Sequence, residues 1–424
     1  MLMKMVEDTK DTMRVLGQKA RKAYALLAQS KEAEKNLALS EAAKAIRAHA
    51  KTILAANAKD MSAGKKAGMS KAMLDRLELT QARIEAMAKS LEDIAKLPDP
   101  LGKVLATFTR PNGLKIERVS VPLGVIGVIY ESRPNVTSDA GALCLKSGNV
   151  VILRGGSDSF HSSSAIVDCL RAGLKVAKLP LDAIQLVPTT DREAVGIMLK
   201  MNEFIDVIIP RGGKSLTSRV MKDSRVPTLL HLDGNCHTYI HKAANKKMAL
   251  EVLLNAKMRR TGICGATESL VIDKDVLSFL PDIVDMLTKA GCEVRGDAIA
   301  CKQDKRIKPA TSADWRTEYL DAILSVKTVA GLDEAIDHIN TYGSHHTDAI
   351  VTEDKKAAAQ FLNRVDSAIV LHNASTQFAD GGEFGFGAEI GIATGRLHAR
   401  GPVGIEQLTT YKYVVKGNGQ IRPK

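Results

Sequence analysis

The chain has 424 residues, which is enough for two or three domains, and its formal net charge is +12. Only 4% of its residues are aromatic, so the base-stacking platforms of single-strand nucleic-acid-binding proteins are poorly supplied. Six scattered cysteines without a CxxC pair argue against a disulfide framework and a zinc site of regular spacing, and no apolar run reaches the roughly 18 residues of a membrane span. We therefore expect a cytoplasmic protein without a metal, which binds neither nucleic acid nor a membrane.

Helical periodicity dominates residues 9–97, where Ala, Leu, Lys and Glu are frequent and apolar residues recur with helical spacing. Asn57, Gly64 and Gly68 are the predicted breaks in this region. The Pro-Asn-Gly sequence at 111–113 then predicts a hairpin within residues 100–123, followed by an apolar strand at 124–131.

Strands and helices alternate between residues 149 and 223, and the strands are short and mostly apolar. Such strands indicate parallel pairing with right-handed crossovers, buried on both faces. Residues 1–226 are therefore predicted to form a doubly wound domain of the nucleotide-binding type. A GxGxxG fingerprint is absent, and RGGKS at 211–215 is not a complete phosphate loop, since Ile208 stands where that pattern needs glycine.

A second alternating α/β unit is predicted for residues 227–373, and residues 374–424 differ from it. This last stretch is rich in glycine and ends in the β-rich run LTTYKYVVKGNGQIR, with no helix after it. A lone terminal strand leaves an unpaired edge, and pairing with another subunit would cover it. We therefore expect a return segment and a C-terminal β oligomerisation tail here, in a homo-oligomer to which the 100–123 hairpin also contributes.

The stretch NAKMRRTGICGATESLVI, residues 255–272, places Cys264 on a turn between a predicted helix and a predicted strand. Small neighbours would let a ligand reach the sulfur, and Arg259 and Arg260 lie within one turn upstream. Nearby cations favour the nucleophilic thiolate over the thiol. On these residues alone, a buried and inert cysteine is an equally good interpretation.

Long motifs in a fixed order extend this interpretation: VPLGVIGVIYESRPNVTSDA, CLKSGNVVILRGGSDS, IIPRGGKSL, NAKMRRTGICGATE, YGSHHTDAIVTED and HARGPVGIEQLTTYK. With them the chain resembles the gamma-glutamyl phosphate reductases, a group within the aldehyde dehydrogenase superfamily, over nearly its whole length. The resemblance implies an α/β, aldehyde dehydrogenase-like fold with two doubly wound α/β domains and a small β oligomerisation element. It makes 1–226 the NADP-binding domain and 227–373 the catalytic domain that carries Cys264.

The same resemblance implies roles for individual residues. Cys264 is the expected nucleophile, and Asn135 is the expected side-chain donor of an oxyanion hole, a role that suits a neutral amide. Arg259 and Arg260 are candidates for binding the substrate phosphate. Eight residues are expected to bind the cofactor NADP(H), because they follow predicted strands or match a superfamily position. They are Arg154, Gly155, Gly156, Ser157, Pro210, Arg211, Gly212 and Glu318. Among these, Arg154 is expected to meet the 2′-phosphate.

One departure bears on the reaction. Hydrolytic aldehyde dehydrogenases carry a general-base Glu in an ELGGK-like motif, and here the matching run is HLDGN, with His231 at that position. Without a water-activating base the thioester would be resolved by phosphate or hydride, although Asp233 lies close in sequence. The expected activity is reduction of L-glutamyl 5-phosphate to L-glutamate 5-semialdehyde through a Cys264 thioester, in proline biosynthesis, with glutamate 5-kinase as a candidate partner. The alternatives are a hydrolytic NAD-dependent semialdehyde dehydrogenase and a non-catalytic, nucleic-acid-binding protein.

Overall fold

The computed structural model describes residues 2–422, except for the side chains of residues 2–7 and 72. The chain forms two compact units. Unit 1 comprises the residues up to Leu230 together with Gly385–Gly391 and the residues from Val403 on, and unit 2 comprises His231–Phe384 and Ile392–Pro402. The first boundary therefore lies four residues after the predicted one at 226/227, and the stretch predicted as a tail, 374–424, is divided between the two units.

Unit 1 begins with a helical region, as predicted. Its helices are α1 (Leu2–Leu27), α2 (Glu32–Ala48), α3 (Ala50–Lys66), α4 (Lys71–Leu77) and α5 (Gln81–Lys96). Gly68 lies in a break with a φ of 72°, where glycine is favoured, but the breaks predicted at Asn57 and Gly64 are wrong, because both residues lie inside α3. The Asn57 side chain is buried and joins α3 to the end of α4, since Nδ2 donates to Leu77 O at 2.8 Å and Leu79 N donates to Oδ1 at 2.8 Å.

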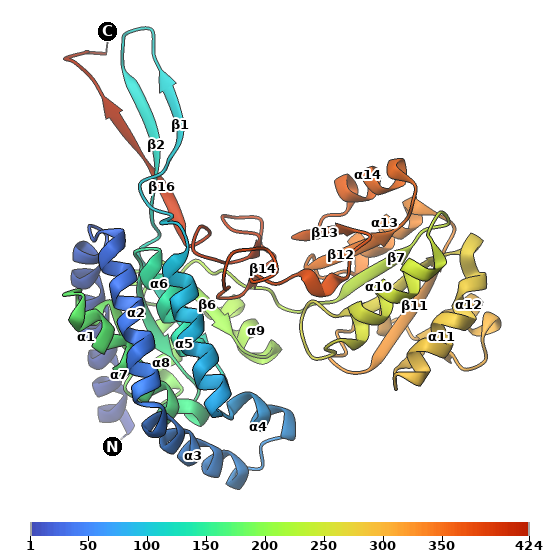
Figure 1. Cartoon of the computed structure of the whole chain (residues 1–424), viewed down its shortest axis with the longest axis horizontal. Helices are drawn as coiled ribbons and strands as arrows, with labels where there is room; N and C mark the ends of the chain where they lie inside the picture. Colours follow the sequence, from blue (N-terminus) through green and yellow to red (C-terminus); the bar gives the residue numbers. More distant parts are fainter. Residues whose placement is uncertain (1, 423–424) are drawn as a thin grey trace. The chain divides into compact units, whose positions relative to one another are not determined.

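A four-stranded parallel sheet forms the core of unit 1 (Figure 1). Its strands are β3 (Val125–Tyr130), β4 (Val150–Arg154), β5 (Ile184–Leu186) and β6 (Val207–Arg211), in the order β5-β4-β3-β6. The connecting helices are η1 (Ser157–Ser159), η2 (Leu181–Ala183), α6 (Asn135–Lys146), α7 (Phe160–Val176), α8 (Glu193–Met198) and α9 (Lys214–Asp223). Because β4 and β6 lie on opposite sides of β3, the winding reverses at β3, and such a switch point marks the usual ligand edge of a doubly wound sheet.

A three-stranded antiparallel sheet extends from the helical part of unit 1 (Figure 1). The predicted hairpin forms its first two strands, β1 (Val104–Thr109) and β2 (Lys115–Pro122), and β16 (Thr409–Lys416) pairs with β2 over its whole length. The prediction of an unpaired terminal strand was therefore wrong, because β2 offers a free edge within the same chain. Apolar side chains remain exposed on β1 and β16, among them Phe108 and Val415, and the homo-oligomer stays a prediction.

Unit 2 is built on a seven-stranded parallel sheet in the order β10-β9-β11-β8-β7-β12-β13. These strands are β7 (Cys236–Ile240), β8 (Thr267–Asp273), β9 (Glu293–Gly296), β10 (Lys308–Pro309), β11 (Ile323–Val329), β12 (Thr347–Val351) and β13 (Ile369–His372). Its helices are α10 (Lys246–Met258), η3 (Lys274–Phe279), α11 (Leu280–Lys289), α12 (Ala298–Gln303), η4 (Asp314–Arg316), α13 (Leu332–Tyr342), α14 (Lys355–Arg364) and η5 (Thr376–Phe378). A two-stranded antiparallel pair, β14 (Ile392–Ala393) with β15 (Gly401–Pro402), completes the unit.

Helices cover both faces of this sheet, because successive residues of a strand point to opposite faces. On β8, Leu270 packs in a cluster with residues of α10 and α11, whereas its neighbour Val271 packs with residues of α13 and α14. The two-sided burial confirms the predicted doubly wound α/β architecture. Within residues 2–422, no helix combines the length and the apolar character that a membrane crossing requires.

Candidate active site

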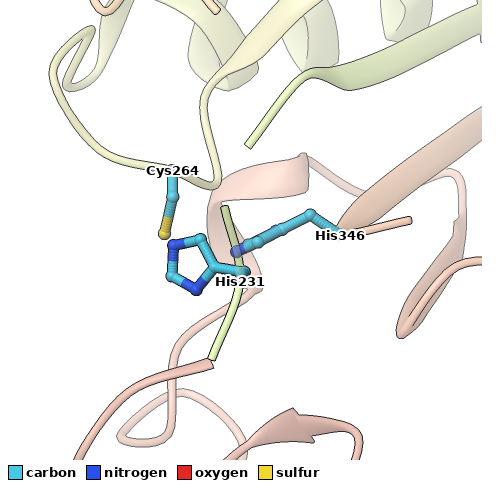
Figure 2. A group of neighbouring side chains, drawn as sticks. All are labelled: His231, Cys264 and His346. Carbon is cyan, nitrogen blue, oxygen red and sulfur yellow. The ribbon is translucent and has the colours of Figure 1, made fainter. Parts of the chain in front are cut away.

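Three chemically reactive side chains of unit 2 lie at the amino ends of adjacent parallel strands. Cys264 precedes β8, His231 precedes β7, and His346 immediately precedes β12. Because β8, β7 and β12 are neighbours in the sheet and run in the same direction, their amino ends meet at one edge. Figure 2 shows the three side chains converging there.

The sulfur of Cys264 and one ring nitrogen of each histidine lie within 4.8 Å of one another. His231 Nδ1 lies 2.6 Å from the carbonyl oxygen of Ile392, so Nδ1 carries a proton and donates it there, and Nε2 faces the sulfur (Figure 2). His346 is fully buried, and its Nδ1 lies 2.9 Å from Thr347 Oγ1. The tip nitrogen of His346 points toward the same group (Figure 2).

The two histidines determine the ionisation of Cys264. Desolvation of the sulfur raises its pKa, but the charge of His346 and the hydrogen bonds and charge of both histidines outweigh that effect, so the pKa of Cys264 lies well below the ordinary thiol value. The arrangement favours a thiolate at neutral pH, which is the nucleophilic form. His346 and His231 therefore lower the pKa of Cys264, a role that the sequence had suggested for Arg259 and Arg260.

Arg259 and Arg260 lie at the end of α10 with exposed side chains. Arg259 Nη1 donates to Gln377 Oε1 at 3.4 Å, and the Gln377 amide donates to Ala256 O at 3.0 Å and to Arg260 O at 3.3 Å. The side chain of Gln377 therefore fixes the turn that leads to Cys264. The structure leaves both guanidinium groups accessible to an anion, and their substrate-binding role stays a prediction.

The backbone around Cys264 is held from the segment before β7. The Cys236 thiol donates to the carbonyl oxygen of Cys264 at 3.1 Å, and Gly234 packs so tightly there that a Cβ would lie 2.7 Å from the Cα of Cys264. Gly234 N in turn donates to Glu318 Oε1 at 2.9 Å. Only glycine fits this close approach, so Gly234 fixes the position of the cysteine.

Glu318 belongs to the same edge, just before β11. Burial raises the pKa of Glu318, the Gly234 hydrogen bond lowers it, and the charges of Cys264 and Asp233 raise it further. Glu318 therefore lies close enough to Cys264 for their charges to interact. One carboxylate oxygen accepts the Gly234 hydrogen bond, and the contact of Glu318 with the nicotinamide ribose stays a prediction.

Asn135 is in unit 1, at the first position of α6. Its side chain is exposed, and Nδ2 donates to Asp139 Oδ2 at 3.1 Å, one helical turn later. Burial raises the pKa of Asp139 to about 6. The preceding loop is strained at Ser132, whose φ of 46° is held by hydrogen bonds to Asp158. Asp139 and Asp158 therefore orient the amide and its loop, and strain of this kind concentrates at functional sites.

Arg154, at the end of β4, is held by backbone carbonyl groups. Its side chain is only 5% exposed and donates to the carbonyl oxygens of Gly155, Thr190 and Asp191. Burial lowers its pKa, while Nε has no hydrogen-bond partner within the described residues. The guanidinium therefore braces the loop at 190–191, and a direct contact of Arg154 with a 2′-phosphate stays a prediction.

Comparisons with known proteins agree with this geometry. A family model described as the aldehyde dehydrogenase family matches residues 1–298. A curated protein of Paramagnetospirillum magneticum named gamma-glutamyl phosphate reductase is 65% identical over 96% of this chain and 97% of its own length. The chain belongs to the gamma-glutamyl phosphate reductases of the aldehyde dehydrogenase family. It is therefore an oxidoreductase, as predicted.

Two further relatives extend this family assignment. A gamma-glutamyl phosphate reductase of Rhodospirillum rubrum is 63% identical over 98% of each chain. The crystal structure of gamma-glutamyl phosphate reductase from Thermotoga maritima matches with a TM-score of 0.95 and 44% identity, and it covers 97% of this chain and 100% of that one. The aldehyde dehydrogenase-like fold is thereby confirmed.

The family implies a nicotinamide cofactor, and the switch-point edge of unit 1 is the edge at which doubly wound sheets usually bind a ligand. A Cβ at Gly155 would lie 3.1 Å from the hydroxyl oxygen of Tyr130 and 3.2 Å from two of its ring carbons, whereas a Cβ at Gly213 would meet nothing within 4 Å. The edge is therefore closely packed at Gly155 and open at Gly213. Gly213, at the start of α9, donates its N–H to the Glu131 carboxylate at 3.0 Å. This helix N-terminus therefore already binds an anionic group.

The remaining predicted cofactor residues are at the same edge of the unit 1 sheet. Ser157 is exposed at the start of η1, Pro210 and Arg211 end β6, and Gly156 and Gly212 follow β4 and β6.

Sequence reasoning missed the role of His346 and assigned His231 no partner. The sequence contained one signal, because His346 precedes a predicted strand just as Cys264 does. The sequence did not show that these two strands lie close together in the sheet.

Proposed function

We propose that this chain reduces L-glutamyl 5-phosphate to L-glutamate 5-semialdehyde and inorganic phosphate with NADPH, the second step from glutamate to proline. The observation that carries the proposal is the lowered pKa of Cys264, which lies between two imidazoles in a chain 65% identical to a protein named gamma-glutamyl phosphate reductase. A thiolate of this kind can attack an acyl phosphate directly.

In the proposed reaction the Cys264 thiolate attacks the γ-carbonyl carbon. The new C–S bond replaces the C–O bond to phosphate, which leaves with its electron pair, and a thioester remains on Cys264. When bound, NADPH supplies a hydride to the thioester carbonyl. The resulting thiohemiacetal releases the aldehyde, and the C–S electrons return to the sulfur as a thiolate beside His231 and His346. The histidines thus stabilise the same charge at the start and at the end of each cycle.

Charge also develops on the carbonyl oxygen during both additions to the carbon. The side-chain amide of Asn135 is the proposed donor to that oxygen, together with a backbone N–H at the cysteine. The hydrogen bond from Asn135 to Asp139 supports this role, because it restricts the rotation of the amide before substrate binds. Arg259 and Arg260 are the proposed partners of the substrate phosphate, and their exposure supports this.

Two sets of residues are proposed to bind the cofactor. Gly155, Gly156 and Ser157, with Pro210, Arg211 and Gly212, are proposed for the adenosine and phosphate groups, and Glu318 for the nicotinamide ribose. Preference for NADP over NAD stays a proposal. Because the Arg154 side chain is buried against carbonyl oxygens, its effect on that preference would act through the loop at 190–191.

The competing function is hydrolytic oxidation of the semialdehyde, which needs a base to activate water. His231 stands where the hydrolytic relatives carry that base, and its Nε2 faces the sulfur (Figure 2). Asp233 and Glu318 lie close enough to interact electrostatically, so both are candidates for a base in that case. The two functions differ in what releases the acyl group from Cys264: phosphate in one, water in the other.

The deciding experiment is run in the direction of oxidation, with L-glutamate 5-semialdehyde and NADP and with or without inorganic phosphate. We expect steady NADPH formation only with phosphate, and without it a burst of about one NADPH per active site. The Cys264→Ala variant should lack the burst, and Cys301→Ala, on α12, should retain it. Steady release of free glutamate without phosphate would instead establish the hydrolytic function.

A further inference from the structure

The group formed by Cys264, His231 and His346 also has the composition of a metal site. It offers one sulfur and two imidazole nitrogens, all within 4.8 Å of one another, although the sequence has no regular zinc spacing (Figure 2). Tetrahedral zinc binds sulfur at about 2.3 Å and nitrogen at about 2.0–2.1 Å, so small side-chain movements would bring all three atoms into its coordination sphere. The ligands come from three separate segments, which is why spacing gave no signal.

Both histidines are already oriented as metal-binding histidines usually are. A ligating imidazole almost always donates its second N–H to a carbonyl, carboxylate or other acceptor, and this fixes the ring and the tautomer. His231 Nδ1 makes that contact with Ile392 O at 2.6 Å, and His346 Nδ1 makes it with Thr347 Oγ1 at 2.9 Å. Each ring therefore turns its other nitrogen toward the sulfur (Figure 2).

The second nitrogen of His346 provides an independent indication. His346 is 0% exposed, and its buried Nε2 lies close to the sulfur of Cys264 but makes no hydrogen bond of normal geometry to any residue of 2–422. A buried polar atom without a partner is costly, and in native structures it calls for an explanation such as an ion. A cation held between the sulfur and this nitrogen would satisfy it.

We propose that Cys264, His231 and His346 form a zinc-binding site with one open coordination position, and that bound Zn²⁺ reversibly blocks the thiolate. Thiolate and imidazole ligands suit Zn²⁺, whereas Mg²⁺ and Ca²⁺ take oxygen ligands. On binding, the metal accepts lone pairs from one sulfur and two nitrogens, and any proton held by those atoms passes to solvent. The inhibition rests on the proposed function, but the binding of the metal does not.

The first test uses the metal-free full-length chain and Co²⁺ as a spectroscopic substitute for Zn²⁺. We expect one Co²⁺ per chain, with a thiolate-to-cobalt charge-transfer band and the visible bands of a tetrahedral complex, both removed by Zn²⁺ and unaffected by Mg²⁺. Cys264→Ser should abolish the charge-transfer band, while Cys301→Ser and the exposed His161→Gln should retain it. A band that survives Cys264→Ser overturns the proposal.

A second test begins with the wild-type chain and then uses two variants of Thr347. Zn²⁺ should slow the alkylation of Cys264 by iodoacetamide in the wild-type chain at least 10-fold, as followed by mass spectrometry, and a chelator should restore the rate. Thr347→Val, which removes the acceptor for His346 Nδ1, should weaken Zn²⁺ binding by roughly 10- to 100-fold, and Thr347→Ser should not. Unchanged alkylation in the presence of Zn²⁺ overturns the proposal. Because neither test measures turnover, their outcome is independent of whether the chain proves to be a reductase.

Discussion

His231 Nδ1 lies 2.6 Å from the carbonyl oxygen of Ile392, a residue 161 positions later in the chain. That hydrogen bond ties the segment before β7 to β14 and fixes which nitrogen of His231 faces Cys264. In the neutral ring Nε2 is then an acceptor, so it can take the proton of the thiol. The reactivity of Cys264 thus depends on a backbone carbonyl that is far away in sequence.

The pH dependence of Cys264 alkylation should report this arrangement. The lowered pKa keeps the sulfur ionised well below the ordinary thiol pKa, so the alkylation rate should stay high as the pH falls through the ordinary value and decline only below the lowered one. His231→Gln removes one of the groups that lower the pKa, so the inflection should move to higher pH. His161→Gln is the control and should leave it unchanged. An identical inflection in wild type and His231→Gln would contradict the assignment.

Cys264→Ala should abolish turnover without loss of fold. The substitution removes the sulfur that is proposed to carry the acyl group, whereas the hydrogen bond from Cys236 to the carbonyl oxygen at position 264 is kept. Activity and far-ultraviolet circular dichroism should be measured together. Alanine variants of Cys144, Cys169, Cys292 and Cys301 should keep their activity, and appreciable turnover by Cys264→Ala would refute the role of the thiolate.

Asn135→Ala should lower kcat by roughly 10² to 10³, the usual effect of removing one oxyanion donor. The side chain is exposed, and its described hydrogen bond is to Asp139, so little change in stability is expected. Steady-state kinetics would separate the two possible outcomes. An effect confined to KM would make Asn135 a residue that positions the substrate.

Gly234→Ala should displace Cys264 and destabilise unit 2. The added Cβ would lie 2.7 Å from both the Cα and the carbonyl carbon of Cys264, where backbone has to move. Overpacking of this kind lowers the free energy of unfolding by about 1–3 kcal/mol. Gly395→Ala is a matched control in the same unit, because a Cβ there meets nothing within 4 Å. Thermal unfolding and kcat of both variants test this prediction, which equal stability and activity would contradict.

Arg154→Ala should lower stability more than it changes cofactor choice. Removing the guanidinium leaves the carbonyl oxygens of Thr190 and Asp191 without this donor, which lowers the free energy of unfolding by about 1–3 kcal/mol. The melting temperature and the ratio of kcat/KM for NADP to that for NAD should be compared with those of wild type. A collapse of that ratio at unchanged melting temperature would restore the direct phosphate contact expected from the sequence.

Local patterns predicted much of the fold, because each depends on neighbours in sequence. The alternation of apolar strands and helices indicated both doubly wound sheets, and Pro-Asn-Gly at 111–113 indicated the β1–β2 hairpin. The partner of β16 could not be predicted in the same way. The pairing of Thr409 with Pro122 depends on which edge the folded chain leaves open, and no local pattern records that.

The site shows the same limit. Cys264 and Asn135 could be named from motifs, but the meeting of Cys264 with His346 follows from the strand order β8-β7-β12, which is a property of the whole sheet. For Arg154, the motif gave no indication of its partners within the chain. A residue type suited to phosphate was expected to bind one, whereas two carbonyl groups of a loop some 36 residues later are its partners.

The pairing of β2 with β16 has a consequence for biosynthesis. Every strand of unit 2 lies between these two strands in sequence, so the ribosome completes the seven-stranded sheet before it makes the partner of β2. Domains generally fold as units during synthesis, and long-range strand pairing is slow. Until residues 409–416 emerge, β2 therefore presents an open edge to other nascent chains on the same polysome. A pause in translation before these residues would prolong that exposure and favour aggregation.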